Sequence, residues 1–274
     1  MTSIANLAAR RELIWNLVLR SLKIRYKGSA LGFLWTLLNP LLMMLIYWLF
    51  ISILLSRLGI KIPLSHLLTG VIFWQFIAMC TSDAVKSVSG FPNLVKKTYF
   101  PRIVLPLSMV IANLINFALS IMVLAVLLLL LKLFAQEAVD FAFLWMLPLV
   151  LVIQFFLVLG ISLLMSSANV FFRDVEHIVG VGLQALFFLT PIIYPLDMVR
   201  DRLSGVFLWL YLLNPMTSLV TLFRKAFLGR ELFAGGEFLP GEPAFYVSLA
   251  LSVVILFVGV RVFAKLEPYF ADHL

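Results

Sequence analysis

Seven apolar intervals without Asp, Glu, Lys or Arg follow one another along the chain, separated by charged segments. A membrane-crossing helix needs about 20 consecutive, mostly apolar residues, and every interval comes close to that length or exceeds it. The pattern therefore predicts an all-α integral membrane protein. The intervals are residues 28–56, 62–82, 103–131, 141–172, 177–196, 203–223 and 243–260.

The sixth interval differs from the others because Asn214-Pro215 interrupts its middle. Proline breaks a helix interior, and a half of about ten residues spans only about 15 Å at 1.5 Å per residue. The hydrocarbon core of a bilayer is about 30 Å thick. We therefore expect six transmembrane helices, with short re-entrant or surface helices in residues 195–230 between the fifth and the sixth.

The positions of Lys and Arg predict that both ends of the chain are cytoplasmic. An even number of crossings places the two termini on one side, and cytoplasmic segments are enriched in basic residues. With this orientation the short outer loops hold Arg57, Lys61 and Lys132. The inner side then holds Arg10, Arg11, Arg20, Lys23, Arg25, Lys27, Lys86, Lys96, Lys97, Arg102, Arg173, Arg261 and Lys265.

Residues 1–28 are predicted to form an amphipathic helix on the inner membrane surface, over residues 4–27. Its polar stripe consists of Asn16, Arg20, Lys23 and Lys27. Its apolar side consists of Ile14, Trp15, Val18, Leu22 and Tyr26. Because Arg11 and Arg25 interrupt the apolar side, an ordinary basic flank of the first crossing is the alternative. A second inner segment, the basic loop 86–102, is predicted to hold a short helix over residues 93–99 that ends before Pro101.

Composition and charge support a membrane protein over a soluble or nucleic-acid-binding one. The 274 residues are 63% hydrophobic and 12% charged, whereas soluble domains are about 25% charged. The net charge is +8, but its basic residues adjoin apolar runs and form no soluble basic face. The first 27 residues are too polar for a cleavable signal peptide. Cys80 is the single cysteine, which excludes an intrachain disulfide.

The residues that usually carry catalysis or bind metals are sparse. No phosphate-binding loop G-x-x-x-x-G-K-[ST] occurs, and His66, His177 and His273 lie far apart, so neither nucleotide nor metal binding is expected. For the carboxylates Asp174 and Glu176 we expect a salt bridge to Arg173 or to another basic residue on the same side. The predicted transmembrane cores hold no Asp, Glu, Lys or Arg, which disfavours an ion-coupled carrier. Any transport would then draw its energy from outside this chain.

Two predicted helical faces combine aromatic and amide side chains. The first crossing presents Trp35, Asn39, Met43, Tyr47, Phe50 and Leu54. The fifth presents Gln184, Phe187, Phe188, Pro191 and Tyr194. Such faces would suit a path for sugar rings, whose C–H groups pack on aromatic rings. The alternative is that Trp and Tyr mark the membrane interfaces and that Phe packs between helices.

Several stretches together resemble one family: RSLKIRYKGSALGFLWTLLNPLLMMLIYWLF, FPNLVKKTYFPRIVLPLS, RDVEH and LTPIIYPLDMV followed by LLNPMTSLVTLFRKAFLG. The family is the membrane permease subunit of bacterial ATP-binding-cassette exporters of cell-surface polysaccharides, of the O-antigen or teichoic-acid type. The resemblance covers nearly the whole chain in the same order. It implies a homodimeric channel in the plasma (inner) membrane, driven by two copies of a separate ATPase that carry ATP and magnesium. This chain would be no enzyme and would hold no cofactor or metal.

The resemblance also implies roles for individual residues. The substrate channel would be lined by Trp35, Asn39, Tyr47, Phe50, Gln184, Phe187, Phe188 and Tyr194. The anionic head group of a lipid-linked polymer, or of a membrane lipid, would be met by Arg20, Lys23, Arg25 and Lys27. The ATPase would be contacted by Phe91, Asn93, Lys96, Lys97 and Tyr99. The exit would be gated by Pro191, Pro195, Asn214, Pro215 and Arg224.

Two other functions remain alternatives. An exporter of a lipid or a small lipophilic drug would share the architecture but would need only a lateral groove. A membrane-embedded enzyme of glycolipid synthesis would need a carboxylate cluster or a metal site near one interface, and the sequence predicts neither.

Overall fold

In a computed structural model, every regular element of the described residues (10–29, 31–32, 34–56, 62–97, 100–229 and 243–274) is helical. The long helices are α3 (Leu34–Ser56), α4 (Leu64–Val85), α6 (Val104–Phe134), α7 (Leu147–Phe171) and α12 (Pro243–Leu266). The shorter ones are α2 (Arg11–Tyr26), α5 (Pro92–Lys97), α8 (Val175–Leu189), α9 (Leu196–Arg200), α10 (Gly205–Leu212), α11 (Pro215–Leu228) and α13 (Phe270–His273). Two 3-10 turns, Leu144–Met146 and Glu267–Tyr269, adjoin α7 and α13.

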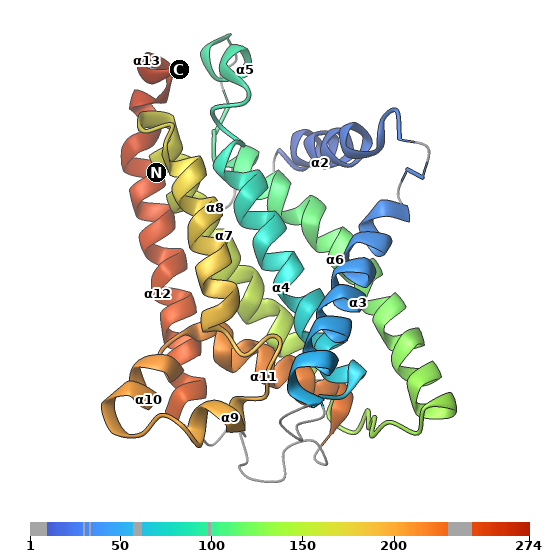
Figure 1. Cartoon of the computed structure of the whole chain (residues 1–274). Coiled ribbons are helices and arrows are strands. Elements are labelled where there is room, and N and C mark those ends of the chain that lie inside the picture. The colour runs from blue at the N-terminus through green and yellow to red at the C-terminus, as the bar shows by residue number, and fades with distance from the viewer. Residues whose placement is uncertain (1–9, 30, 33, 57–61, 98–99, 230–242) are drawn as a thin grey trace.

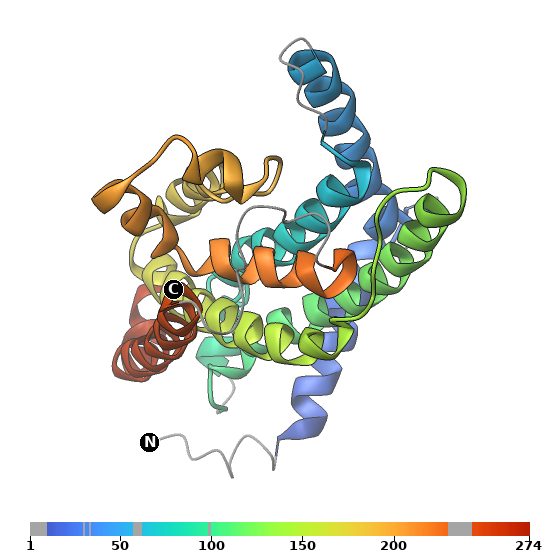
Figure 2. The ribbon, with the colours of Figure 1, turned by 90° about the horizontal axis from the view of Figure 1, so that it is seen from below.

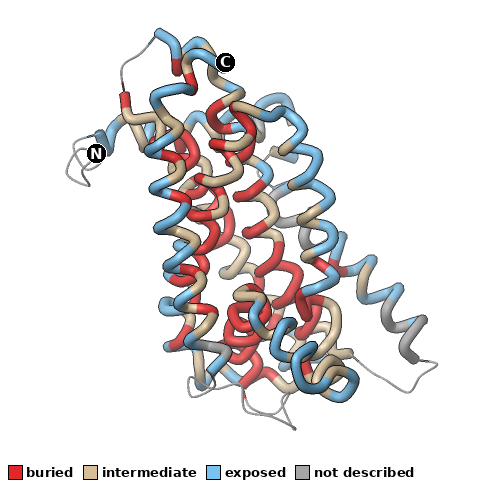
Figure 3. Tube along the Cα trace, turned by 90° about the vertical axis from the view of Figure 1, so that its left-hand side faces the viewer, coloured by how far each residue is buried: buried red, intermediate tan, exposed pale blue. Residues whose placement is uncertain are grey.

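Helix α4 is the centre of the bundle and packs against α3, α6, α7, α8 and α11. Helices α2, α5 and α13 gather at one end, with α2 lying across the bundle, and α9 and α10 lie at the opposite end (Figure 1). Seen from that opposite end, α11 crosses beneath the bundle while α3 extends outward (Figure 2). Buried positions line the interior, and exposed ones face outward along the helices (Figure 3).

The described helices include four that are long and apolar enough to cross a membrane, α4, α6, α7 with its preceding turn, and α12 with the C-terminal turns. A fifth candidate is the pair α10 and α11, whose axes bend by 72° at their break. The structure thus contains four to five candidate spans where the sequence predicts six. The apolar stretch Leu41–Phe50 in α3 and helix α8 are shorter, at 10 and 15 residues respectively.

Helix α8 ends at Leu189 and not at Leu196, where the predicted fifth crossing ends. Thr190 precedes Pro191 and has extended backbone angles (φ −113°, ψ 140°), because the proline ring disfavours the α conformation of the residue before it. A helix of 15 residues spans about 22 Å, which is less than the bilayer core.

The break predicted at Asn214-Pro215 is confirmed by the separate helices α10 and α11. The Asn214 side chain accepts a hydrogen bond from the backbone N–H of Met216 (3.0 Å) and so caps α11. Pro215 occupies the first helical position, where its missing N–H costs nothing. Asparagine and proline therefore end one helix and begin the next.

Helix α2 confirms that residues 11–26 of the predicted surface helix are helical, and its burial pattern differs from the predicted apolar side. Leu17 and Val18 are buried against the bundle, but Trp15, predicted on the apolar side, is 53% exposed. Leu17 belongs to a second core cluster at this end of the molecule, which also includes Val95 of α5, Phe263 of α12 and Phe270 of α13. This cluster joins α2 and the C-terminal turn to α5.

Candidate functional site

A groove of about 630 Å³ lies between α3, α4 and α8. It brings together predicted channel residues from two segments that are far apart in the sequence. From α3 come Asn39 and Tyr47, and from α8 come Gln184, Phe187 and Phe188. Its other lining residues are Met43, Val71, Trp74, Gln75, Ala78, Met79, Ser82, Asp83, Gly180 and Leu183.

The aromatic rings in this groove contact one another across helices. The ring centroids of Tyr47 and Phe187 are 5.3 Å apart, and the Trp74 ring meets Phe187 edge-on at 5.8 Å. Phe188 extends from α8 with 63% exposure and packs edge-on against Phe187 at 5.2 Å. Flat π surfaces beside amide side chains can bind a sugar through its C–H face and its hydroxyl groups together.

The α4 wall of the groove was not among the predicted site residues. Val71, Trp74, Gln75, Ala78 and Ser82 line it at steps of three and four residues, as one helical face does. Gln75, Ser82 and Asp83 on one face of a largely apolar helix were the signal that could have identified it.

Three predicted channel residues lie outside the groove lining. Trp35 and Phe50 lie on exposed faces of α3, at 48% and 64% exposure. The Tyr194 hydroxyl donates to the Phe188 carbonyl oxygen (2.6 Å) and lies 3.1 Å from the Tyr211 hydroxyl. Tyr194 therefore joins the end of α8 to α10.

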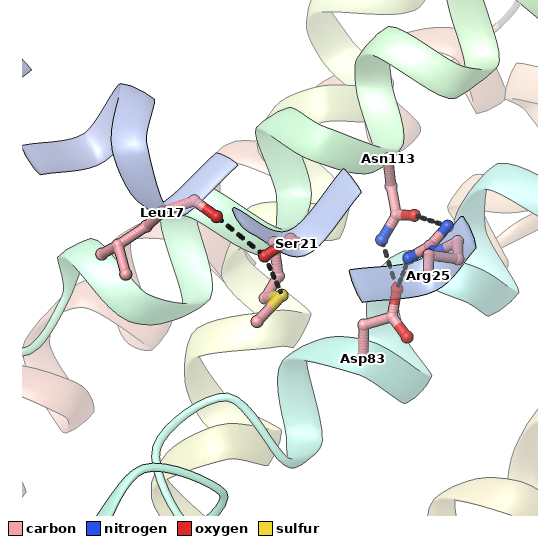
Figure 4. A network of polar contacts seen from close by, with 6 residues as sticks. Leu17, Ser21, Arg25, Asp83 and Asn113 are labelled. Atoms are coloured by element: carbon pink, nitrogen blue, oxygen red, sulfur yellow. Dashed lines mark hydrogen bonds and ion pairs between the residues drawn. The ribbon is translucent and has the colours of Figure 1, made fainter. Parts of the chain in front are cut away.

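Arg25 connects α2 to α4 and α6 through a polar network (Figure 4). Its guanidinium forms an ion pair with Asp83 and donates to the side-chain oxygen of Asn113 (2.8 Å). The Asn113 amide nitrogen in turn donates to Asp83 (2.8 Å). In the same view the Ser21 hydroxyl lies 2.9 Å from the Leu17 carbonyl oxygen and 3.3 Å from the sulfur of Met109.

The four predicted head-group residues divide between two hollows. Arg20 and Arg25 line a pocket of about 360 Å³, together with Asp83, Lys86 and Phe91. The Arg20 guanidinium lies 4.9 Å from the centre of the Phe91 ring. Lys23 and Lys27 line a separate, mostly apolar groove of about 720 Å³ beside Leu22, Ile24, Ile115, Asn116 and Leu119.

The predicted ATPase-contacting helix is present as α5, one residue earlier than expected. Val95 is buried and anchors α5, while Asn93, Lys96 and Lys97 are exposed at the end of the bundle. Phe91 is partly buried beside the second core cluster, and Tyr99 lies outside the described residues. The salt bridge expected for the carboxylates of RDVEH is confirmed, because Glu176 pairs with Lys86 at 2.6 Å.

Among the predicted gate residues, Arg224 is almost completely buried, at 1% exposure. Its guanidinium donates to the backbone carbonyls of Pro191 and Ile192 and, at 3.3 Å, to that of His66. Asn214 donates to the Thr190 hydroxyl (3.0 Å). Arg224 of α11 and the capping residue Asn214 are thus both bonded to residues 190–192, directly after α8. Pro195 precedes α9, and Pro215 begins α11.

The described residues contain no group of three His, Cys, Asp or Glu side chains placed to hold a metal ion.

Comparisons with known proteins agree with a transport role. Residues 12–228 match the family model described as ABC-2 type transporter. The chain is 33% identical over 269 residues to the O-antigen export system permease protein RfbA of Klebsiella pneumoniae, covering 98% of this chain and 97% of that one. It is 34% identical over 264 residues to the protein of the same name from Myxococcus xanthus, covering 96% of each. The polysialic acid transport protein KpsM of Escherichia coli is 24% identical over 253 residues, which is 92% of each chain.

Proposed function

The chain belongs to the ABC-2 type transporter family, and we propose that it is the permease subunit of an ATP-driven exporter of a lipid-linked cell-surface polysaccharide, O-antigen in particular. The observation that carries this function is the similarity to O-antigen export permeases over nearly the whole of both chains. The transported polymer is proposed to pass along the groove between α3, α4 and α8.

We propose a homodimer in which two copies of this groove face each other and close into one channel. The outward face of α3 supports this arrangement, because Leu45, Ile46 and Phe50 are more than half exposed next to the groove. Helices α3 and α8 would then complete six crossings, stabilised by the second copy and by lipid. A channel lined by aromatic rings and amides binds each sugar weakly, which lets a long chain slide.

Energy is proposed to come from two copies of a separate ATPase that bind ATP and magnesium. The exposed Lys96 and Lys97 of α5 support a contact with that partner, because they project at the end of the bundle that also holds α2. The basic residues at this end support a cytoplasmic location for it and for both termini. The protein would then lie in the plasma (inner) membrane.

The decisive experiment is reconstitution of the purified chain with its ATPase in liposomes that contain a lipid-linked polysaccharide. We expect ATP-dependent movement of the polymer across the bilayer and co-purification of the two proteins. Transport by this chain without any ATPase would contradict the proposal. An exporter of a lipid or a lipophilic drug would move such cargo and leave the polymer where it started.

A further inference from the structure

Asp83 lies at the junction of two hollows that are otherwise lined by different residues. It belongs to the wall of the aromatic groove between α3, α4 and α8 and also to the wall of the basic pocket beneath α2. Its carboxylate is held by Arg25, which lines the basic pocket. The Arg25–Asp83 ion pair therefore lies where the basic pocket and the groove meet.

The basic pocket has an excess of positive charge. Arg20, Arg25 and Lys86 line it, and Asp83 is the one carboxylate among its lining residues. Lys86 reaches its own carboxylate partner, Glu176, from the rim of the pocket. A volume of about 360 Å³ with this balance of charge suits a phosphate or diphosphate group, and arginine binds such groups through two parallel N–H donors.

The hydrogen bonds around the ion pair allow it to open. Asn113 accepts from Arg25 through its oxygen and donates to Asp83 through its nitrogen, both at 2.8 Å. Each ion therefore keeps one partner when the other ion leaves. Both side chains are also partly accessible, at 24% for Arg25 and 35% for Asp83, so water can solvate the separated carboxylate.

We propose that Asp83 is an internal substitute for a phosphate, and that a phosphate or diphosphate anion displaces it from Arg25 in the basic pocket. The displacement opens the way from the pocket to the groove, so that only cargo with an anionic group at its leading end passes. This inference rests on the proposed function for its cargo, a lipid-linked polymer. The claim that one anion replaces another on Arg25 does not depend on the identity of the cargo.

Binding of anions to the purified full-length chain tests the exchange. Isothermal titration calorimetry would use inorganic pyrophosphate and farnesyl diphosphate as probes, with farnesol as the uncharged control. Asp83→Asn keeps the size of the side chain and removes the competing charge. We expect it to raise the affinity for a diphosphate probe about tenfold, as loss of one charge-assisted competitor implies. Asp83→Glu, which keeps the charge, should bind as the wild type does.

Arg25→Gln should lose most of the diphosphate binding, and Lys132→Gln, which removes an exposed cation at the far end of α6, should not change it. If Asp83→Asn binds both probes no more tightly than the wild type, the exchange is overturned, whether or not Arg25→Gln folds. If Asp83→Asn raises the affinity for both probes, the pocket recognises the diphosphate group itself. If it raises the affinity for farnesyl diphosphate alone, the pocket recognises a diphosphate attached to a lipid. Failure of the proposed function would be a different result from failure of the anion exchange. In that case the wild-type protein would show no ATP-dependent export of the polymer.

Discussion

A Cβ atom on Gly70 of α4 would overlap the guanidinium nitrogen Nη2 of Arg224 on α11. The same atom would also meet the carbonyl oxygen of Ile192, which accepts a hydrogen bond from Arg224. Gly70 thus leaves the space in which an arginine crosses from α11 to the end of α8. The absence of a side chain on one helix is what allows a cation to be buried between two others.

Gly70→Ala is expected to lower the stability of the protein by about 1–3 kcal/mol, because overfilling a packed site costs that much. Thermal unfolding in detergent should show a clear fall in melting temperature. The matched control is Gly182→Ala on α8, where a Cβ meets nothing within 4 Å, so a helix-favouring residue should leave the melting temperature unchanged or raise it. Equal melting temperatures of Gly70→Ala and the wild-type protein would show that the Arg224 side chain has space to move.

Arg224→Lys should loosen residues 190–195 from α11 while keeping the positive charge. A lysine cannot reach all three carbonyls that the planar guanidinium binds. Leu196, 4% exposed at the start of α9, offers a reporter: as Leu196→Cys in a Cys80→Ala background, it should react faster with a maleimide when Arg224 is lysine. Replacement of Lys132 by arginine, far from this site in the sequence, serves as the control and should leave the rate unchanged. An unaltered rate in Arg224→Lys would mean that the carbonyl bonds do not hold this segment closed.

Local rules predicted the elements that depend on neighbouring residues. The helix break at Asn214-Pro215 and the short α5 before Pro101 follow from the geometry of proline, which acts within a few residues. The long apolar intervals gave α4, α6, α7 and α12 for the same reason, since about 20 apolar residues in lipid satisfy their backbone only as a helix. The apolar run predicts that α8 extends to Leu196, because Thr190 lies inside this run. The helix ends earlier, since Pro191 disfavours the helical conformation of Thr190.

Contacts between distant residues could not be predicted in the same way. Arg25 and Asp83 are 58 positions apart. The helical period places Arg25 on the apolar side of α2 but does not indicate which residue it contacts. The sequence placed Arg224 just after the interval 203–223, at the edge of the apolar region. The structure buries it beside the backbone carbonyls of Pro191 and Ile192, which follow the end of α8 in non-helical backbone, and an arginine can satisfy several carbonyls at once.

Tyr47→Ala is expected to slow polymer export about fivefold without changing the amount of protein in the membrane. Its ring packs on Phe187 across the groove, and loss of one aromatic contact of about 1 kcal/mol weakens each binding step by roughly that factor. Trp48→Ala is the matched control, because Trp48 is an aromatic residue next to Tyr47 on the same helix but outside the groove lining. Export slowed equally by both substitutions would indicate a general effect on α3 instead of a path along the groove.

Reversing the charges of Lys96 and Lys97 to Glu should uncouple ATP hydrolysis from export. Both side chains are exposed on α5, which is anchored by the buried Val95, so the substitutions change the surface and leave the packing intact. In the reconstituted complex, export should fall severalfold while each protein remains folded. Lys132→Glu is the control for a charge change elsewhere. Unchanged export by the double variant would exclude these lysines from the contact with the ATPase.

The C-terminal turn should hold the loop 86–102 in place, and Phe270 is the residue that tests this. Arg102 donates its backbone N–H to the Glu267 carboxylate (2.7 Å) and its guanidinium to the Glu267 carbonyl. Phe270 is fully buried against Phe263 and shares a cluster with Val95 of α5. Because truncation of a buried phenylalanine costs about 3–5 kcal/mol, Phe270→Ala should free α5 before it unfolds the bundle.

Hydrogen–deuterium exchange can separate these two effects of Phe270→Ala. We expect faster exchange in residues 86–97 and unchanged exchange in the centre of α4, because the second core cluster lies at the bundle end and α4 packs in the main core. Tyr269→Ala is the matched control: its side chain is next in sequence but 56% exposed, so its loss should leave both regions as they are. Faster exchange throughout α4 would show instead that the C-terminus stabilises the whole bundle. A local effect, together with ATP hydrolysis that continues while export falls, would show that α5 couples hydrolysis to export only while the C-terminal turn holds it in place.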